Sequence, residues 1–160
     1  MSLRRKGREL AVQVLYQWDI HRHTTQWLED FWAQNQAHSE IRAFADGLVH
    51  GVIEHAEELD RVMAHSSENW SVSRMAITDR TVLRIAVYEL LHRPDIPGRV
   101  TLNEAIEIVT RFGDEQSGAF VNGILDHILR DDPRLQAKAR EAMPSLPSVA
   151  HAWDRQGPHD

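Results

Sequence analysis

The sequence of 160 residues contains no cysteine and no long run of apolar residues. The lack of cysteine excludes disulfide bridges, thiol catalysis and zinc sites built on thiolates. No apolar run approaches the roughly 18 residues that a membrane span needs. The first apolar segment, residues 11–18, is interrupted by Gln13 and Gln17, so it does not form the core of a signal peptide. We therefore expect a cytoplasmic protein that does not enter a membrane.

Motifs for catalysis and metal binding are also missing. The sequence has ten histidines, but none of them forms an HExxH pattern or a comparable set of ligands. His21 and His23 lie where the first helix should end, and the spacing of His50 and His55 is a poor match to one helical face. There is no phosphate-binding glycine loop and no GxSxG motif. The sequence thus predicts no enzyme, no metal site and no cofactor.

Charge is distributed unevenly along the chain. The formal net charge is −6, yet the first eight residues carry four basic side chains and no acidic one, so the remaining 152 residues sum to −10. The four are Arg4, Arg5, Lys6 and Arg8. Cations at the start of a helix face the positive end of its dipole, which costs about 0.3–1 kcal/mol each. Local stability does not account for them, which leaves open a partner rich in phosphate as well as a basic end that is merely solvated. We expect Arg4, Arg5 and Arg8 to be exposed, because they precede most of the apolar stripe.

Apolar residues recur with the period of an α-helix along most of the chain, and no segment shows sustained alternation. The apolar stripes lie within residues 11–18, 41–63, 82–91, 105–109 and 120–129. Pro94 and Pro97 end the third stripe. Residues 101–104, Thr-Leu-Asn-Glu, match a capping box and predict a helix start there. We predict an all-α protein of about seven helices.

Two regions have the residue types that bind RNA. At about 100° per residue, Arg5 and Tyr16 lie close together around the first helix, which offers guanidinium groups near its start and a ring further along. Guanidinium groups bind phosphate and rings stack on unpaired bases, although a Tyr16 ring packed in the core fits the pattern equally well. In the second region, residues 111–126, a turn at Gly113 leaves the backbone amides of residues 115–118 without helical partners, which favours an anion.

Four segments in a fixed order resemble the NusB family of bacterial transcription antitermination factors. They are RRKGRELAVQVLYQWD (4–19), Trp70 with DRTVLRIAVYELL (79–91), LNEAIEI (102–108) and RFGDEQSGAFVNGILD (111–126). The resemblance covers residues 4 to about 130. It implies an all-helical fold of two packed helical bundles. It also implies binding to the boxA element of ribosomal RNA operon leader RNA together with NusE, a small-subunit ribosomal protein, in an antitermination complex with RNA polymerase.

Carried over by position, the resemblance also implies the site residues. RNA contacts fall on Arg4, Arg5, Lys6, Arg8, Tyr16, Phe112, Gln116, Ser117 and Phe120, and the surface facing NusE falls on Asp79, Arg80 and Arg84. Gln116 stands where some family members carry an acid, which leaves its role open. The RNA-binding domain is expected to span residues 1–132. Residues 133–160 are expected to form a short helix, at 134–142, and a flexible C-terminal tail in which Trp153 is the one residue able to dock on the body.

Other interpretations stay open at this point. A similar helical domain precedes the catalytic domain of some rRNA cytosine methyltransferases, although 160 residues leave no room for a cofactor-binding sheet. A helical adaptor that binds protein and no RNA is a second alternative, and the basic cluster argues against it. Gly47 and Gly51 lie on one helix face, where they allow another backbone to approach closely, either within the chain or in a homodimer.

Overall fold

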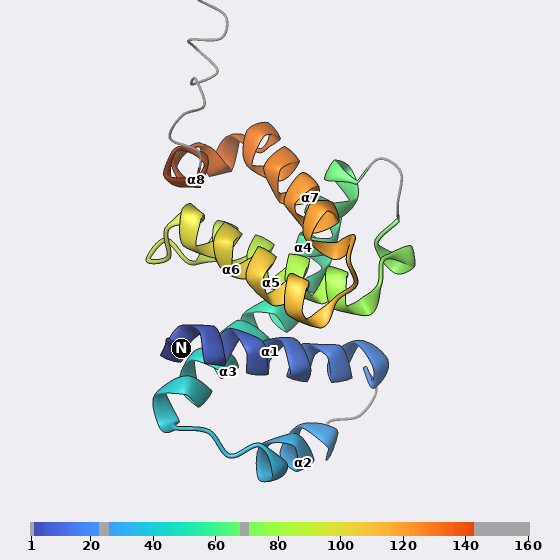
Figure 1. Ribbon diagram of the computed structural model, residues 1–160, viewed down its shortest axis with the longest axis vertical. Coiled ribbons are helices and arrows are strands. Elements are labelled where there is room, and N and C mark those ends of the chain that lie inside the picture. Colours follow the sequence, from blue (N-terminus) through green and yellow to red (C-terminus); the bar gives the residue numbers. More distant parts are fainter. Residues whose placement is uncertain (1, 23–25, 68–70, 143–160) are drawn as a thin grey trace, which may run out of the picture.

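The computed structural model describes residues 2–22, 26–67 and 71–142, and within these ranges it contains helices and no strand (Figure 1). The α-helices are α1 Leu3–Ile20, α2 Gln26–Gln34, α3 Ser39–Glu54, α4 Ala56–Ser66, α5 Ile77–His92, α6 Gly98–Phe112, α7 Ser117–Asp131 and α8 Gln136–Ala142. Two 3₁₀ turns, η1 Val72–Arg74 and η2 Pro133–Leu135, precede α5 and α8. The all-α prediction is confirmed. The described ranges hold eight α-helices rather than about seven, because α8 is the short helix expected near residue 134.

Some expectations lie outside the described residues. These are the tail after residue 142, with Trp153, and Trp70 in the resemblance. No helix within the described ranges combines the length and apolar character that a bilayer crossing requires.

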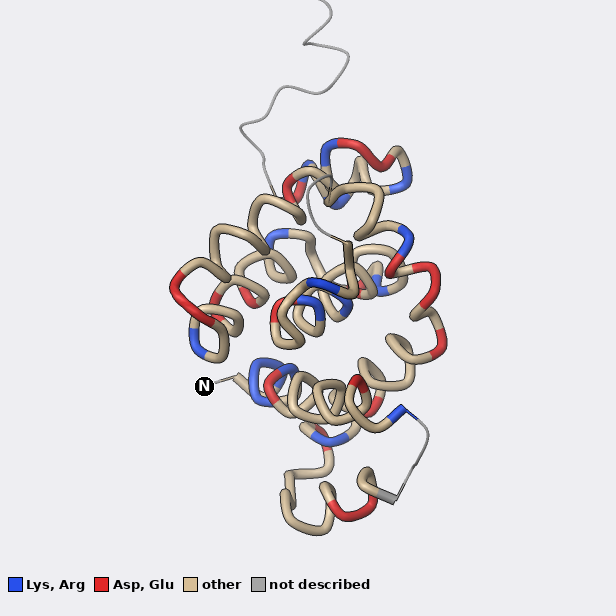
Figure 2. Tube along the Cα trace, turned by 90° about the vertical axis from the view of Figure 1, so that its right-hand side faces the viewer, with Lys and Arg blue, Asp and Glu red and all other residues tan. Residues whose placement is uncertain are grey.

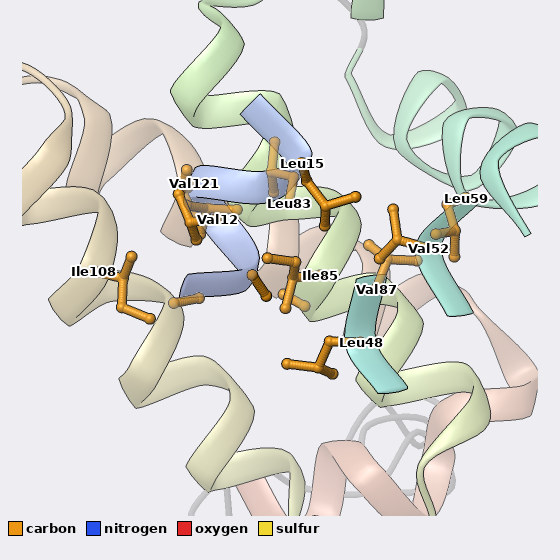
Figure 3. Packing of buried hydrophobic residues seen from close by; sticks show 14 of the residues in the cluster. Val12, Leu15, Leu48, Val52, Leu59, Leu83, Ile85, Val87, Ile108 and Val121 are labelled. Carbon is orange, nitrogen blue, oxygen red and sulfur yellow. The ribbon is translucent and has the colours of Figure 1, made fainter. Parts of the chain in front are cut away.

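Helix α5 is the centre of the fold. Residues 81–87 are all buried, so the helix is covered on every side over two turns, as expected of a helix without a polar face. Helices α1 and α3 pack against it from one side, and α4, α6 and α7 pack against it elsewhere (Figure 1). Figure 3 shows Leu15 of α1, Val52 of α3, Leu83 and Val87 of α5 and Val121 of α7 in one cluster of buried side chains.

The helices form two groups around this core. Helices α1 to α3 make up the lower group in Figure 1, and α4 to α8 make up the upper one. Helix α1 packs against α3 within its own group and against α5 of the other. This agrees with the two packed bundles that the family resemblance implies.

Helix α6 begins earlier than its sequence predicts. It starts at Gly98 after Pro97, and the Gly98 amide donates to the carboxylate of Glu141 on α8 at 3.2 Å. Thr101 and Glu104 lie inside the helix, and their side chains bond to other helices. The prediction of a capping box is therefore wrong. A proline start and a carboxylate from a distant helix replace the local cap.

The two glycines of α3 do not serve a close backbone approach. A Cβ atom at Gly51 would lie 2.0 Å from the ring of Tyr88 on α5, so this glycine makes room for a side chain. A Cβ atom at Gly47 would meet no described atom within 4 Å. The expectation that another backbone packs on this pair within the chain is wrong for the described residues.

Candidate nucleic-acid interface

Two ion pairs at the surface join helices α1 and α6. The Arg5 guanidinium donates to both carboxylate oxygens of Glu104, with Nε 2.9 Å and Nη2 3.0 Å away. One turn further along α1, Glu9 pairs with Arg111 near the end of α6. We call this surface the α1–α6 seam. It consists of Arg4, Arg5, Lys6, Glu9 and Tyr16 from α1 and Glu104, Arg111 and Phe112 from α6.

The first turn of α1 supplies the exposed cations of the seam. The Arg4 side chain is 52% exposed, lies 3.7 Å from the carboxylate of Asp95, and has its guanidinium 5.1 Å from the centre of the Phe44 ring. Lys6 is exposed, and the described residues hold no ion pair to it. The Glu104 carboxylate raises the pKa of Arg5 further above its ordinary value. Figure 2 shows this basic turn beside the N-terminus.

Arg8 is not on the seam. Its side chain is 3% exposed and that of Glu89 is 1% exposed, and the guanidinium donates to both oxygens of that carboxylate, at 2.9 and 3.0 Å. The expectation that Arg8 is exposed is wrong. Position 8 lies three and seven residues before Ala11 and Leu15, which are both buried, so it belongs to the core-facing stripe of α1.

Two rings are exposed along the seam. Tyr16 is 36% exposed and Phe112 is 43% exposed, which fits rings that offer a face or edge to an unpaired base. The guanidinium of Arg111 lies 5.8 Å from the centre of the Phe112 ring, and half of the Arg111 side chain is exposed. Our sequence prediction did not include Arg111, although its place directly before Phe112 was a usable indication.

The turn from α6 into α7 is closed by its own side chains. The Ser117 hydroxyl accepts from the Asp114 amide at 3.1 Å and donates to the Asp114 carboxylate at 3.2 Å, and the Gln116 amide donates to the same carboxylate at 2.9 Å. Ser117 is buried, Gln116 is exposed and Phe120 packs partly on the core. The Ser117 amide donates to the Asp114 carbonyl at 3.2 Å. The amides of Gln116 and Ser117, which were expected to be available to an anion, therefore already have hydrogen-bond acceptors within the turn.

A cleft joins this turn to the start of α5. It has a volume of about 220 Å³ and is lined by Arg74, Met75, Ala76, Asp79, Asp114, Gln116, Ser117 and Phe120. Asp79 is buried, and its Oδ1 atom has no hydrogen-bond partner among the described residues. The structure therefore brings one residue expected to face NusE, Asp79, to the same cleft as three residues expected to contact RNA.

Arg80 and Arg84 hold the end of α1 against α4 and α5. Both bind the carboxylate of Asp19, Arg80 at 2.6 and 2.9 Å and Arg84 at 2.9 Å, and Arg84 also binds Asp60 at 2.8 and 3.0 Å. Burial raises the pKa of Asp19, but the hydrogen bonds and charges of the two arginines more than offset it, so the pKa lies below its ordinary value. Arg84 is buried, and only part of Arg80 reaches the surface.

One group of side chains among the described residues has the composition of a metal site. Ligand atoms of His55, Glu58 and His92 all lie within 4.8 Å of one another. The prediction of no metal site did not consider this group, because His92 lies at the end of α5, far in the sequence from His55 and Glu58.

The comparisons with known proteins agree with the fold. The model of the NusB family matches residues 5–130. The transcription antitermination protein NusB of Geobacter sulfurreducens is 49% identical over 130 residues, which cover 80% of this chain and 94% of that protein. The solved structure of T. maritima NusB has a TM-score of 0.72 and 37% identity, and covers 82% of this chain and 92% of that chain.

A third comparison concerns a complex. A chain from a crystal structure of the antitermination factors NusB and NusE with dsRNA has a TM-score of 0.68 and 28% identity, and covers 80% of this chain and 96% of that chain. An all-helical fold is thus shared with a class of transcription antitermination factors. The chain belongs to the NusB family.

Proposed function

We propose that this chain is a transcription antitermination factor of the bacterial cytoplasm that binds boxA-type leader RNA of ribosomal RNA operons together with NusE, as part of an RNA polymerase complex. The observation that carries the proposal is the α1–α6 seam, which combines exposed cations with two exposed rings in an acidic chain. Membership of the NusB family supports it, as does the related complex of NusB and NusE with RNA. In this proposal the chain binds RNA and protein and catalyses no reaction.

RNA contacts are assigned to the exposed seam. Arg4, Arg5, Lys6 and Arg111 neutralise phosphates, and Tyr16 and Phe112 stack on bases. Gln116 and Phe120 extend the same surface at the α6–α7 turn. Arg8 and Ser117 are buried, so they support this surface from beneath: Arg8 fixes α1 on α5, and Ser117 closes the turn.

Carboxylates compensate much of this positive charge. Arg4 lies near Asp95, and the other two seam arginines are paired with Glu104 and Glu9. A phosphate must compete with these carboxylates, so the chain alone should bind RNA weakly. A basic partner beside the seam would extend the positive surface and cover bases left in water.

We place that partner at the cleft between the α6–α7 turn and the start of α5. Asp79 lines this cleft, and its neighbour Arg80 is partly exposed beside it. Arg84 acts indirectly, because it is buried and holds Asp19 and Asp60 in place. A partner seated there would lie beside the turn and next to RNA on the seam.

A titration of fluorescent boxA RNA tests the proposal. The measurement compares this chain alone, NusE alone and the mixture. We expect affinity to rise at least about tenfold with saturating NusE, which is a coupling near 1.4 kcal/mol, and RNA should tighten the protein pair by the same factor. Equal affinities with and without NusE would contradict the role of the partner. Binding of NusE without any RNA affinity would leave an adaptor that binds protein only.

Charge reversal locates the surface. The variant R4E/K6E/R111E should lose RNA binding, because it inverts three exposed cations of the seam. The matched control is R61E/R130E/R140E, which inverts three exposed arginines on α4, α7 and α8. Equal losses in the two variants would show that net charge alone, and not the seam, governs binding.

A further inference from the structure

Three side chains from two neighbouring helices converge at the surface, away from the seam. His55 is the residue between α3 and α4, Glu58 lies in the first turn of α4, and His92 ends α5. The His92 Nε2 and Glu58 Oε1 atoms are 2.6 Å apart, and the two imidazole rings stack with centres 3.9 Å apart. All three residues are partly exposed.

The packing of the helices brings these groups together. Helices α4 and α5 pack against each other, which fixes the distance between Glu58 and His92. His55 stands at the N-cap position of α4, but its side chain makes no cap hydrogen bond. Its ring stacks on His92 instead. The ring of Tyr88 stacks on both imidazoles, with centres 6.0 Å from His55 and 5.5 Å from His92, and it is seated against Gly51.

The donor set indicates which ion would bind. Two imidazole nitrogens and one carboxylate oxygen suit zinc and related transition metals, whereas magnesium and calcium prefer oxygen ligands alone. In a tetrahedral zinc site with bonds of about 2.0–2.1 Å, ligand atoms lie roughly 3.4 Å apart. Ligand atoms that already lie within 4.8 Å reach this spacing by small side-chain rotations, which partly exposed side chains permit.

We propose that His55, Glu58 and His92 bind one zinc ion, with the fourth position open to solvent. The ion would replace the proton shared by His92 and Glu58, and it would clamp the α3–α4 junction to the end of α5. The alternative is a hydrogen-bonded stack of side chains with no affinity for metal.

Zinc titration of the metal-free full chain tests this site. Isothermal calorimetry should show one equivalent of Zn²⁺ bound, no response to Mg²⁺, and a melting temperature raised by at least about 5 °C at a hundredfold excess over the Kd. Co²⁺ should give the visible absorption bands of a tetrahedral site. Wild-type chain that binds no Zn²⁺ would overturn the proposal.

Matched variants separate this site from adventitious binding to other histidines. His92→Asn and Glu58→Gln should each weaken Zn²⁺ binding at least tenfold and abolish the Co²⁺ bands. The control His50→Asn/His65→Asn removes two exposed histidines of α3 and α4 and should leave both readouts unchanged. Unaltered binding by Glu58→Gln and His92→Asn, or loss of binding in the control, would overturn the assignment. Circular dichroism in the presence of EDTA confirms that each variant is folded. The outcome is independent of RNA binding.

Discussion

The guanidinium of Arg8 and the carboxylate of Glu89 form a pair of hydrogen bonds inside the protein, 2.9 and 3.0 Å long. The hydroxyl of Thr101 donates a third bond to the same carboxylate at 2.8 Å. These contacts connect α1, α5 and α6 at one point. Removing one member of such a pair leaves the other charged and without solvent, which is costly. Arg8, the most buried of the four basic residues at the start of α1, is therefore part of the core.

Replacing Arg8 should thus destabilise the fold. We expect Arg8→Ala to lower the free energy of unfolding by about 3–5 kcal/mol, because Glu89 keeps its charge in the interior. Arg4→Ala, four residues earlier on the surface, should change it by less than about 0.5 kcal/mol. Urea unfolding followed by circular dichroism measures both. Equal midpoints for Arg8→Ala and the wild type would contradict the structural role of Arg8.

Patterns within one helix predict that helix, but they do not predict its contacts with other helices. Helical periodicity predicts α1 and α5 because each apolar stripe depends only on residues within one helix. The same stripe includes position 8, but an arginine there is acceptable only because Glu89 lies opposite, 81 residues away. The group of His55, Glu58 and His92 and the start of α6 also depend on residues that are distant in the sequence. Such pairings leave no local pattern, so sequence reasoning missed them. It also missed Arg111, although it named the other exposed cations and rings of the seam.

Two glycines provide a matched test of helix packing. A Cβ atom at Gly7 of α1 would lie 2.7 Å from the Phe44 ring and 3.2 Å from the Ile41 carbonyl, whereas one at Gly47 of α3 would meet no described atom within 4 Å. Gly7→Ala should therefore cost about 1–3 kcal/mol through overpacking. Gly47→Ala should stabilise the protein by about 0.5–1 kcal/mol, because alanine favours a helix interior. Thermal unfolding measures both, and a stabilised Gly7→Ala variant would contradict the close packing of α1 on α3.

The salt dependence of RNA binding should reflect four cations that each contact one phosphate. If Arg4, Arg5, Lys6 and Arg111 each neutralise one phosphate of a single strand, the slope of log affinity against log salt should be near −3, at about 0.7 per phosphate. Arg111→Ala should make the slope shallower by about 0.7. The control Arg130→Ala, which removes an exposed arginine of α7, should leave it unchanged. A slope near zero would mean that the basic turn of α1 is only solvated.

Acid should weaken the fold through Asp95. The hydrogen bond from Arg93 lowers the pKa of Asp95 from 3.8 to about 2 in the folded protein. Because the folded pKa lies below the unfolded one, the carboxylate stabilises the protein above about pH 4, and this contribution is lost as the pH falls toward 2. We expect the urea midpoint to decrease over this window, and Asp95→Asn should make the decrease smaller. An identical pH profile for Asp95→Asn would contradict this account.

Helix α8 and the preceding turn η2 pack on the other helices through three kinds of contact. Leu135 of η2 is buried in the core. The Lys138 ammonium donates to two backbone carbonyls that follow α5. They are the Arg93 carbonyl, at 2.7 Å, and the Ile96 carbonyl. Glu141 accepts the amide at the start of α6. These contacts lie beyond residue 130, where the family match ends.

Truncation should therefore separate two parts of the C-terminal region. A chain that ends at Met143 keeps α8, so we expect it to fold and to bind RNA like the full chain. A chain that ends at Asp132 loses the contacts of Leu135, Lys138 and Glu141. Truncating a fully buried leucine alone costs about 2–5 kcal/mol, so this shorter chain should be markedly less stable. Urea unfolding and RNA titration of both chains measure the difference. Equal stability of the two would show that the folded domain ends at residue 132, and a large loss in the longer one would show that residues after 143 also pack on the body.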